Sequence, residues 1–215
     1  MSGRSSHKPW KRIVWTRLRK WLLPHWQDVW PEVVARANIT PTLHLGSGLS
    51  PLAGATTVDL NQAVRPQVIC DLNNTPWPFA DNSFETVVAL SIVEHLDNFL
   101  AVMGEIHRVT RPGAMVNILV PHFSSGAAFV DPTHKQHLSA RSCDYFIEGC
   151  ATGMDYGFYV PYRYELVRCF VELAPVCRYL PGAAWLARRH TAFWEDYLCY
   201  VLRGAGIFWQ LKVMK

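Results

Sequence analysis

No two of the six cysteines form a C-x-x-C pair, so the sequence lacks the spacing of a zinc ribbon or a thioredoxin-type redox site. No apolar run reaches the roughly 18 residues that a membrane-spanning helix needs, and no secretory signal is visible. These absences favour reduced cysteines and a cytoplasmic location. Half of the 215 residues are apolar and 18% are charged, as expected for a single globular domain.

Acidic residues are missing from the first 27 positions, which hold seven Lys and Arg. The rest of the chain holds 14 Lys and Arg against 17 Asp and Glu, a net charge of about −3. The overall charge of +4 therefore comes from the amino-terminal segment. A main domain with a slight negative charge is no basic platform for nucleic acid, so no nucleic-acid partner is expected.

The same basic segment is rich in tryptophan, and residues 10–23 show a helical period. One face of this helix would carry Trp10, Val14, Trp15, Leu18, Trp21 and Leu22. Pro24 ends the pattern, and a second short helix is expected at about 28–37. Three roles are open for residues 10–23: a packing helix or lid, a helix in peripheral contact with a membrane surface, or an organelle presequence. The expected division is a helical head over 1–37 and a main domain over 38–215.

The complete dinucleotide-binding fingerprint is also absent, because the G-x-G of Gly46 and Gly48 has no third glycine. Asp59 follows too soon as well, since that fingerprint places its acid about 20 residues further on. An ordinary NAD site is therefore not expected. Even so, a buried strand at 42–46, a glycine turn and an acid closing the next strand are how a doubly wound sheet holds a nucleoside.

The rest of the chain alternates between strand and helix patterns. Further strands are expected at 68–72, 84–90, 114–120, 162–167 and 207–213, with a helix that starts after Ser91 and stops at 111–113. This alternation predicts an α/β fold with a mostly parallel sheet. Ligands of such sheets bind beyond the carboxyl ends of the strands. Glycines, carboxylates and a histidine gather at these ends, which predicts a single site there.

Five stretches with a distinctive order follow from Leu43 onward. They are L-H-L-G-S-G from Leu43, V-D-L from Val58, D-L-N-N-T-P-W-P-F-A-D-N-S-F-E from Asp71, S-I-V-E-H-L from Ser91 and E-I-H-R-V-T-R-P-G-A from Glu105. Together they resemble a class I S-adenosylmethionine-dependent methyltransferase of the type 11 group. The resemblance implies a Rossmann-like, doubly wound sheet of seven strands, mostly parallel with an antiparallel last strand and helices on both faces. It also implies S-adenosylmethionine as cofactor and S-adenosylhomocysteine as product.

The resemblance further implies which residues bind the cofactor. They are His44, Gly46, Ser47, Gly48, Asp59, Leu60, Asp71, Leu72, Leu90 and Ser91. The glycine turn would pass under the methionine part, Asp59 would hold the ribose, and Asp71 would frame the adenine. His44 departs from the family pattern, because many members have an acid there. A neutral imidazole would leave the cofactor amino group to backbone or water.

Methyl transfer mainly needs alignment of the reactants, but some oxygen or nitrogen acceptors also need a general base, most often histidine. The candidate catalytic residues are His122, His134 and His95. Each has an alternative structural role, in which its ring bonds the backbone or a helix end. A metal site built from His122, Asp131, His134 and His137 has suitable ligand types but an unfamiliar spacing, so no metal is predicted.

Residues 141–205 are rich in aromatic side chains, which are expected either to fill the core or to cover an apolar or planar acceptor. A helical aromatic insertion is expected at about 170–205. The expected function is methyl transfer to oxygen or nitrogen of a small-molecule or lipid-like acceptor. Two alternatives remain open: a degenerate module that binds the cofactor without turnover, and a membrane-associated interaction protein that uses the Trp/Arg head. The sequence makes no prediction of the oligomeric state.

Overall fold

The computed structural model of the chain describes residues 26–150 and 155–215. The helix predicted at 10–23 lies outside these residues. The described helices are α2 (Trp30–Ala37), α3 (Phe99–Val109), α4 (Ala127–Val130), α6 (Pro175–Arg178), α7 (Ala183–Arg189) and α8 (Thr191–Tyr197). Short 3-10 turns lie at η1 (Trp26–Asp28), η2 (Gln62–Val64), η3 (Val93–His95), η4 (Asp144–Phe146) and η5 (Gly157–Tyr159). None of these helices is both long and apolar enough to cross a membrane.

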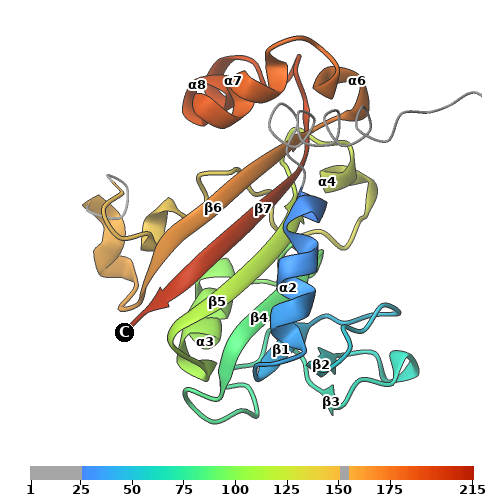
Figure 1. Cartoon of the computed structure of the whole chain (residues 1–215), viewed down its shortest axis with the longest axis vertical. Helices are drawn as coiled ribbons and strands as arrows, with labels where there is room; N and C mark the ends of the chain where they lie inside the picture. Colours follow the sequence, from blue (N-terminus) through green and yellow to red (C-terminus); the bar gives the residue numbers. More distant parts are fainter. Residues whose placement is uncertain (1–25, 151–154) are drawn as a thin grey trace, which may run out of the picture.

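Seven strands form one sheet (Figure 1). They are β1 (Thr42–Leu45), β2 (Thr56–Asp59), β3 (Val68–Ile69), β4 (Phe84–Leu90), β5 (Thr110–Pro121), β6 (Arg163–Leu173) and β7 (Gly204–Met214). Their spatial order is β3-β2-β1-β4-β5-β7-β6. The strands from β3 to β5 pair in parallel, whereas β7 is antiparallel to both β5 and β6. The predicted mostly parallel sheet with an antiparallel last strand is confirmed.

Helices cover both faces of this sheet, because the strands of a parallel sheet are apolar on both sides. Val33 and Ala37 of α2 pack with Val88 and Phe208 on one face. On the other face, α3 buries apolar side chains such as Met103 among those of β1, β4 and β5. Figure 1 shows α2 in front of the sheet and α3 behind it. The core is thus two layers separated by the sheet, as predicted.

Element boundaries differ from the sequence expectation at several places. The helix expected from Ser91 begins only at Phe99, because Asn98 adopts an extended backbone and its side chain caps the helix by accepting from Ala101 N. The preceding residues form η3 instead. β6 runs on to Leu173 rather than ending near 167, and β3 is only two residues long.

Helices α6, α7 and α8 connect β6 to β7. Figure 1 shows them at one end of the sheet, near the ends of β6 and β5. Trp194 of α8 packs against His122, which directly follows β5, with ring centroids 5.0 Å apart. This connection therefore packs over the carboxyl end of β5.

Candidate cofactor site

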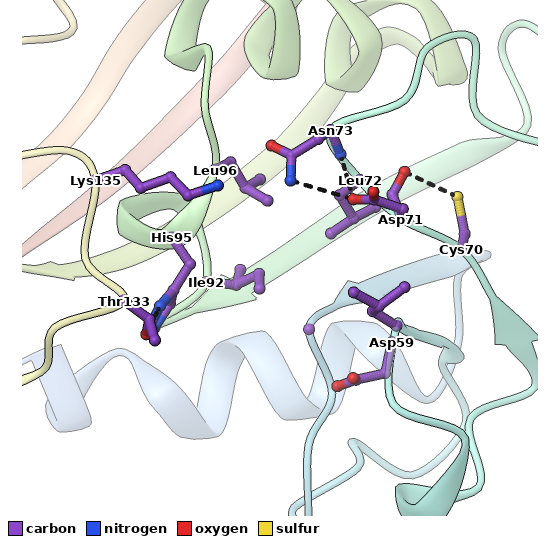
Figure 2. Close-up of a pocket in the computed structure, with 12 residues that line it drawn as sticks. Asp59, Cys70, Asp71, Leu72, Asn73, Ile92, His95, Leu96, Thr133 and Lys135 are labelled. Carbon is purple, nitrogen blue, oxygen red and sulfur yellow. Dashed lines mark hydrogen bonds between the residues drawn. The ribbon is translucent and has the colours of Figure 1, made fainter.

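A cavity of about 260 Å³ lies at the carboxyl ends of β1, β2, β3 and β4. Its walls are formed by Gly46, Asp59, Leu60, Cys70, Asp71, Leu72, Asn73, Ile92, His95, Leu96, Thr133 and Lys135. Figure 2 shows Asp59 and Asp71 on one side, and His95, Thr133 and Lys135 on the opposite side. The position agrees with the rule that doubly wound sheets bind ligands where their parallel strands end.

The glycine turn after β1 forms the floor of this cavity. Gly46 and Gly48 both have positive φ, +58° and +50°, a conformation that favours glycine. A Cβ atom on Gly46 would lie 2.5 Å from Cγ1 of Ile92. Ile92 can therefore pack against the turn only because residue 46 is a glycine, which has no side chain. The backbone here can therefore approach a ligand closely.

Asp59 ties this turn to the end of β2. Its Oδ2 accepts a hydrogen bond from Gly48 N at 2.9 Å, and its Oδ1 accepts one from Asn61 N at 2.9 Å. An ionised carboxylate has about four lone-pair sites, so two bonds leave capacity for ligand hydroxyls. The side chain is half-buried and held in one orientation at the cavity wall.

Asp71 organises the loop after β3 in a similar way. Its Oδ1 accepts from both the backbone and the side chain of Asn73, and its Oδ2 accepts from Asn74 Nδ2. The side-chain oxygen of Asn73 in turn accepts from Asp97 N at 2.8 Å. This chain of bonds joins the loop after β3 to the segment after η3, across the cavity.

The remaining predicted cofactor residues lie near the cavity without lining it. Ser47 and Gly48 belong to the glycine turn, Leu90 is the last residue of β4 and Ser91 directly follows it. Ser91 has a positive φ of +50° and donates its N–H to Leu119 O at 2.8 Å. A strained non-glycine residue at a strand end is a feature often found beside functional sites.

His44 is buried in β1, where its Nδ1 accepts a hydrogen bond from Leu52 N at 3.1 Å. Burial lowers the pKa of His44, and the carboxylate of Asp59 only partly opposes this shift. The ring is therefore neutral at pH 7. A neutral imidazole at this position agrees with the expectation from the sequence.

The three candidate catalytic histidines lie in two places. His95 lines the cavity, and His134 stacks edge-on against it with ring centroids 4.6 Å apart. His122 lies elsewhere, fully buried under α8. Its Nδ1 accepts from Ser124 N at 3.1 Å, so Nε2 carries the proton and donates it to Glu195 Oε1 at 3.1 Å. Both ring nitrogens of His122 are thus engaged inside the protein.

Glu195 is the anchor of this buried group. Burial would raise the pKa of its carboxyl, but hydrogen bonds from His122, Ala140 N and Arg141 outweigh burial and hold the pKa below the ordinary value. The carboxylate joins α8 to the residues after β5 and to the start of the 140s loop. These contacts of Glu195 hold segments of the fold together.

Glu94, which precedes His95, is 1% exposed. Burial raises the pKa of Glu94 to about 7. From sequence it was indistinguishable from an ordinary acid in the first turn of a helix.

Sequence reasoning missed six wall residues: Cys70, Asn73, Ile92, Leu96, Thr133 and Lys135. Ile92 directly follows the predicted Ser91, and Thr133 lies within the D-P-T-H stretch, so proximity to predicted residues was the available signal. Lys135 pairs with Asp97 through Nζ and Oδ1 at 2.7 Å. Its backbone N–H donates to Glu94 O, which draws the loop to the cavity.

A second cavity of about 520 Å³ adjoins the first, since Lys135 lines one and Gln136 the other. Gln136 donates from Nε2 to the carbonyls of Leu96 and Asp97, which ties the loop after α4 to the segment that follows η3. The second cavity is lined by Phe99, Leu100, Gln136, His137, Leu138, Ser139, Arg141, Ser142, Tyr145 and Tyr159. The mixture of aromatic rings and polar groups suits a small organic ligand.

Known proteins share part of this sequence and its fold. Residues 47–118 match the family model of a methyltransferase domain of type 11. A search of curated proteins found no match. A solved S-adenosylmethionine-dependent methyltransferase from Archaeoglobus fulgidus is similar at 14% identity and a TM-score of 0.55, over 93% of this chain and 99% of that one.

Two further solved structures share the architecture. The [4+2]-cyclase SpnF is 13% identical with a TM-score of 0.52, over 87% of this chain and 80% of that one. The YcgJ protein from Bacillus subtilis is 12% identical with a TM-score of 0.50, over 88% and 97% of the two chains. At such identities the likeness is one of fold. The chain therefore has the fold of the class I S-adenosylmethionine-dependent methyltransferases, whose cofactor is S-adenosylmethionine, and its residues 47–118 match a methyltransferase domain.

Proposed function

We propose that this protein is a methyltransferase that moves the methyl group of S-adenosylmethionine to an oxygen or nitrogen of a small-molecule or lipid-like acceptor. The observation that carries the proposal is the pair of adjoining cavities at the carboxyl edge of the sheet. One has the backbone turn and the carboxylates that suit a nucleoside, and the other has an aromatic and polar wall. A ligand in each would meet near the shared segment at 135–136.

The first cavity fits the cofactor through its own residues. The backbone of Gly46, which lines the cavity, would lie under the methionine part, and Asp59 has spare lone pairs for two ribose hydroxyls. Leu72 and Asp71 would frame the adenine. When bound, the cofactor supplies an electrophilic methyl group on a sulfonium.

The second cavity would orient the acceptor. Phe99 and Tyr145 offer flat apolar surfaces, and Arg141 lies beside them, partly neutralised by Glu195 and Asp196. His95 lines the first cavity, and in this proposal it would be the histidine that takes a proton from an acceptor. His134 contacts His95 and would position it.

The cofactor assignment is tested by calorimetric titration with S-adenosylmethionine and S-adenosylhomocysteine, with NADH as the control ligand. We expect both sulfur ligands to bind at one site per chain and NADH to show no heat of binding. Binding of NADH, or of none of the three, would contradict the proposal. Cofactor binding without methyl transfer to any acceptor screened would favour the degenerate module.

Asp59 provides the sharper test of the site itself. Asp59→Asn keeps one acceptor oxygen for the glycine turn but removes the charge, and Asp59→Ala removes both. We expect Asp59→Ala to weaken S-adenosylhomocysteine binding by about 1.5–3 kcal/mol, the usual worth of hydrogen bonds to a charged group. Asp59→Asn should lose a smaller part of the binding free energy.

The matched control is Asp81→Ala, since Asp81 is exposed, pairs with Arg108 and does not line the cavity. Thermal melting of all three variants checks that they are folded. Unchanged affinity in folded Asp59→Ala would remove Asp59 from the site.

We also propose that the protein is cytoplasmic and makes peripheral contact with a membrane through residues 10–23. In this proposal the chain divides into a head at 1–37 and a main domain at 38–215. The main domain has an aromatic helical insertion at about 170–205. Exposed aromatic side chains on α7 and α8 support a membrane surface as partner, since Trp185 and Phe193 remain more than half accessible to solvent. Arginines at the end of α7 add positive charge there. A lipid-like acceptor would be reached from such a surface.

A further inference from the structure

The turn η3 and the loop after α4 bring three potential metal ligands together beside the cofactor cavity. Glu94, His95 and His134 each place one ligand atom within 4.8 Å of the other two. Backbone bonds hold the two segments in place, because Lys135 N and Gln136 N both donate to Glu94 O, at 2.7 and 2.9 Å. The cluster therefore depends on main-chain geometry and not on loose surface side chains.

The carboxylate of Glu94 lacks a hydrogen-bond partner. The residue is 1% exposed, and within residues 26–150 and 155–215 neither of its oxygens is hydrogen-bonded. Burying a carboxylate without compensation is costly. A buried carboxylate without a hydrogen-bond partner in a folded protein indicates a partner that the protein itself does not provide.

The hydrogen bonds of His95 leave one ring nitrogen free to bind an ion. Thr133 Oγ1 donates its only proton to Asp131 Oδ1 at 2.7 Å, so it can only accept from His95 Nδ1 at 2.9 Å. The proton of neutral His95 therefore sits on Nδ1, and Nε2 carries a lone pair.

His134 is arranged in the same way. Its Nδ1 lies 3.2 Å from Ala128 O, a carbonyl that can only accept, so Nδ1 carries the proton. Its Nε2 then carries a lone pair. Asp131 Oδ2 lies 4.0 Å from this nitrogen, beyond hydrogen-bond reach. One ring nitrogen of each histidine and one oxygen of the buried carboxylate thus lie within 4.8 Å of one another.

We propose that Glu94, His95 and His134 bind a divalent metal ion through the Glu94 carboxylate and the two Nε2 atoms. One carboxylate with two histidines is a known ligand set for zinc in sites that keep an open coordination position. The Nδ1–H donors to Ala128 O and Thr133 Oγ1 are the outer contacts that fix the tautomers of metal-binding histidines. The sequence prediction of no metal rested on His122, Asp131, His134 and His137, a different set.

The ion would lie at the wall of the cofactor cavity, because His95 and Thr133 both line that wall. An open position would take an oxygen of the acceptor, so the site selects for an acceptor with a hydroxyl or carboxylate group. This selection rests on the proposed methyl transfer, whereas binding of the ion does not. His95 would then serve as a ligand and not as a base.

The test uses the full chain freed of metal by dialysis against a chelator. Zn²⁺ is titrated by calorimetry and Co²⁺ by visible absorption, in wild type and in Glu94→Gln and His134→Asn. We expect one ion per chain in wild type and at least a tenfold loss of affinity in each variant. Glu94→Gln keeps the side-chain shape and removes a buried charge, so we expect it to fold, which thermal melting checks.

His137→Asn is the matched control, because His137 is exposed on the same loop and lies outside the cluster. It should bind as wild type does. Equal affinity in wild type and Glu94→Gln, or no bound ion at all, would overturn the proposal, as would thiolate charge-transfer bands in the Co²⁺ spectrum. Titration of the same samples with S-adenosylhomocysteine separates the two proposals, since a chain that binds the ion but not this ligand supports the metal site and contradicts the methyltransferase.

Discussion

His44 lies in β1 and His122 directly follows β5, and both rings are buried, but their hydrogen-bond partners differ. His122 donates to the carboxylate of Glu195 and packs on Trp194. His44 instead receives a backbone N–H from Leu52 on Nδ1, and burial lowers its pKa. Residue type alone therefore does not set the chemistry of a histidine, because its bonding partners decide where its protons lie.

His44 should make folding sensitive to mild acid. Its pKa in the folded chain lies below the ordinary value of 6.5, so the unfolded chain takes up the proton first as the pH falls. The stability that neutral His44 confers is complete above pH 6.5 and is lost as the pH falls through the folded-state pKa. His44→Asn keeps an acceptor for Leu52 N but does not titrate, so its free energy of unfolding should fall less steeply from pH 7.5 to about pH 5.

Urea unfolding at a series of pH values measures this slope. The exposed His137→Asn serves as the control and should keep the slope of wild type. A slope in His44→Asn as steep as that of wild type would show that other groups cause the acid sensitivity.

At the scale of elements, one carboxylate of α3 secures the long connection between β3 and β4. Glu105 is 8% exposed and accepts from Trp77 N at 2.8 Å and from both Nε and Nη2 of Arg108. Arg108 also donates to the carbonyls of Trp77 and Phe79. Burial would raise the pKa of Glu105, but these bonds hold it below the ordinary value. The connection, which starts with cavity residues, is thereby fixed on the helix.

Glu105→Gln should destabilise the fold by about 1–3 kcal/mol, since it weakens charged hydrogen bonds at a buried site. The matched control is Glu165→Gln, because Glu165 forms an exposed pair with Lys212 at 2.9 Å. Exposed pairs contribute only about 0–1 kcal/mol, so this change should be nearly neutral. Denaturant unfolding compares the two, and equal losses would mean that the Glu105 bonds carry no special weight.

At the scale of the whole molecule, the aromatic insertion lies against the carboxyl end of β5, at the same edge of the sheet as the cavity. The 135–136 segment joins the two cavities, and α8 packs on the residues that follow β5. On the face of the sheet that bears α2, Val29, Val33 and Ala37 belong to the apolar core. The predicted head thus contains a part, α2, that packs as an integral layer of the domain.

Membrane contact through residues 10–23 predicts a difference between the full chain and a variant that lacks residues 1–25. This variant keeps α2, so the sheet face stays covered. We expect the full chain to sediment with vesicles of anionic lipid and the variant to sediment less, because seven basic residues are lost. Vesicles of neutral lipid are the control. Equal sedimentation of both proteins would exclude the head as an anchor.

Much of the fold could be predicted from the chain because its signals are local. Apolar runs such as that of β4, glycines that tolerate positive φ, and the acid at Asp59 each act within a few residues. The ends of helices and strands were less predictable where capping or strand pairing sets them. Asn98, for example, caps α3, so this helix starts later than its apolar pattern predicts. Of the three candidate catalytic histidines, His95 lines the cavity and His134 packs against His95, whereas His122 is buried beneath α8.

The sequence by itself determined the class of fold, the edge of the sheet at which the cavity lies and the glycine turn with Asp59, because these depend on short-range patterns. Only the tertiary structure decided which polar groups share a space. Glu94 meets His134 because the main chain after α4 bonds back to the η3 turn across about 40 positions. Hydrogen bonds between such distant residues leave no periodic trace in a sequence, so the role of a titratable group emerges only after the chain has folded.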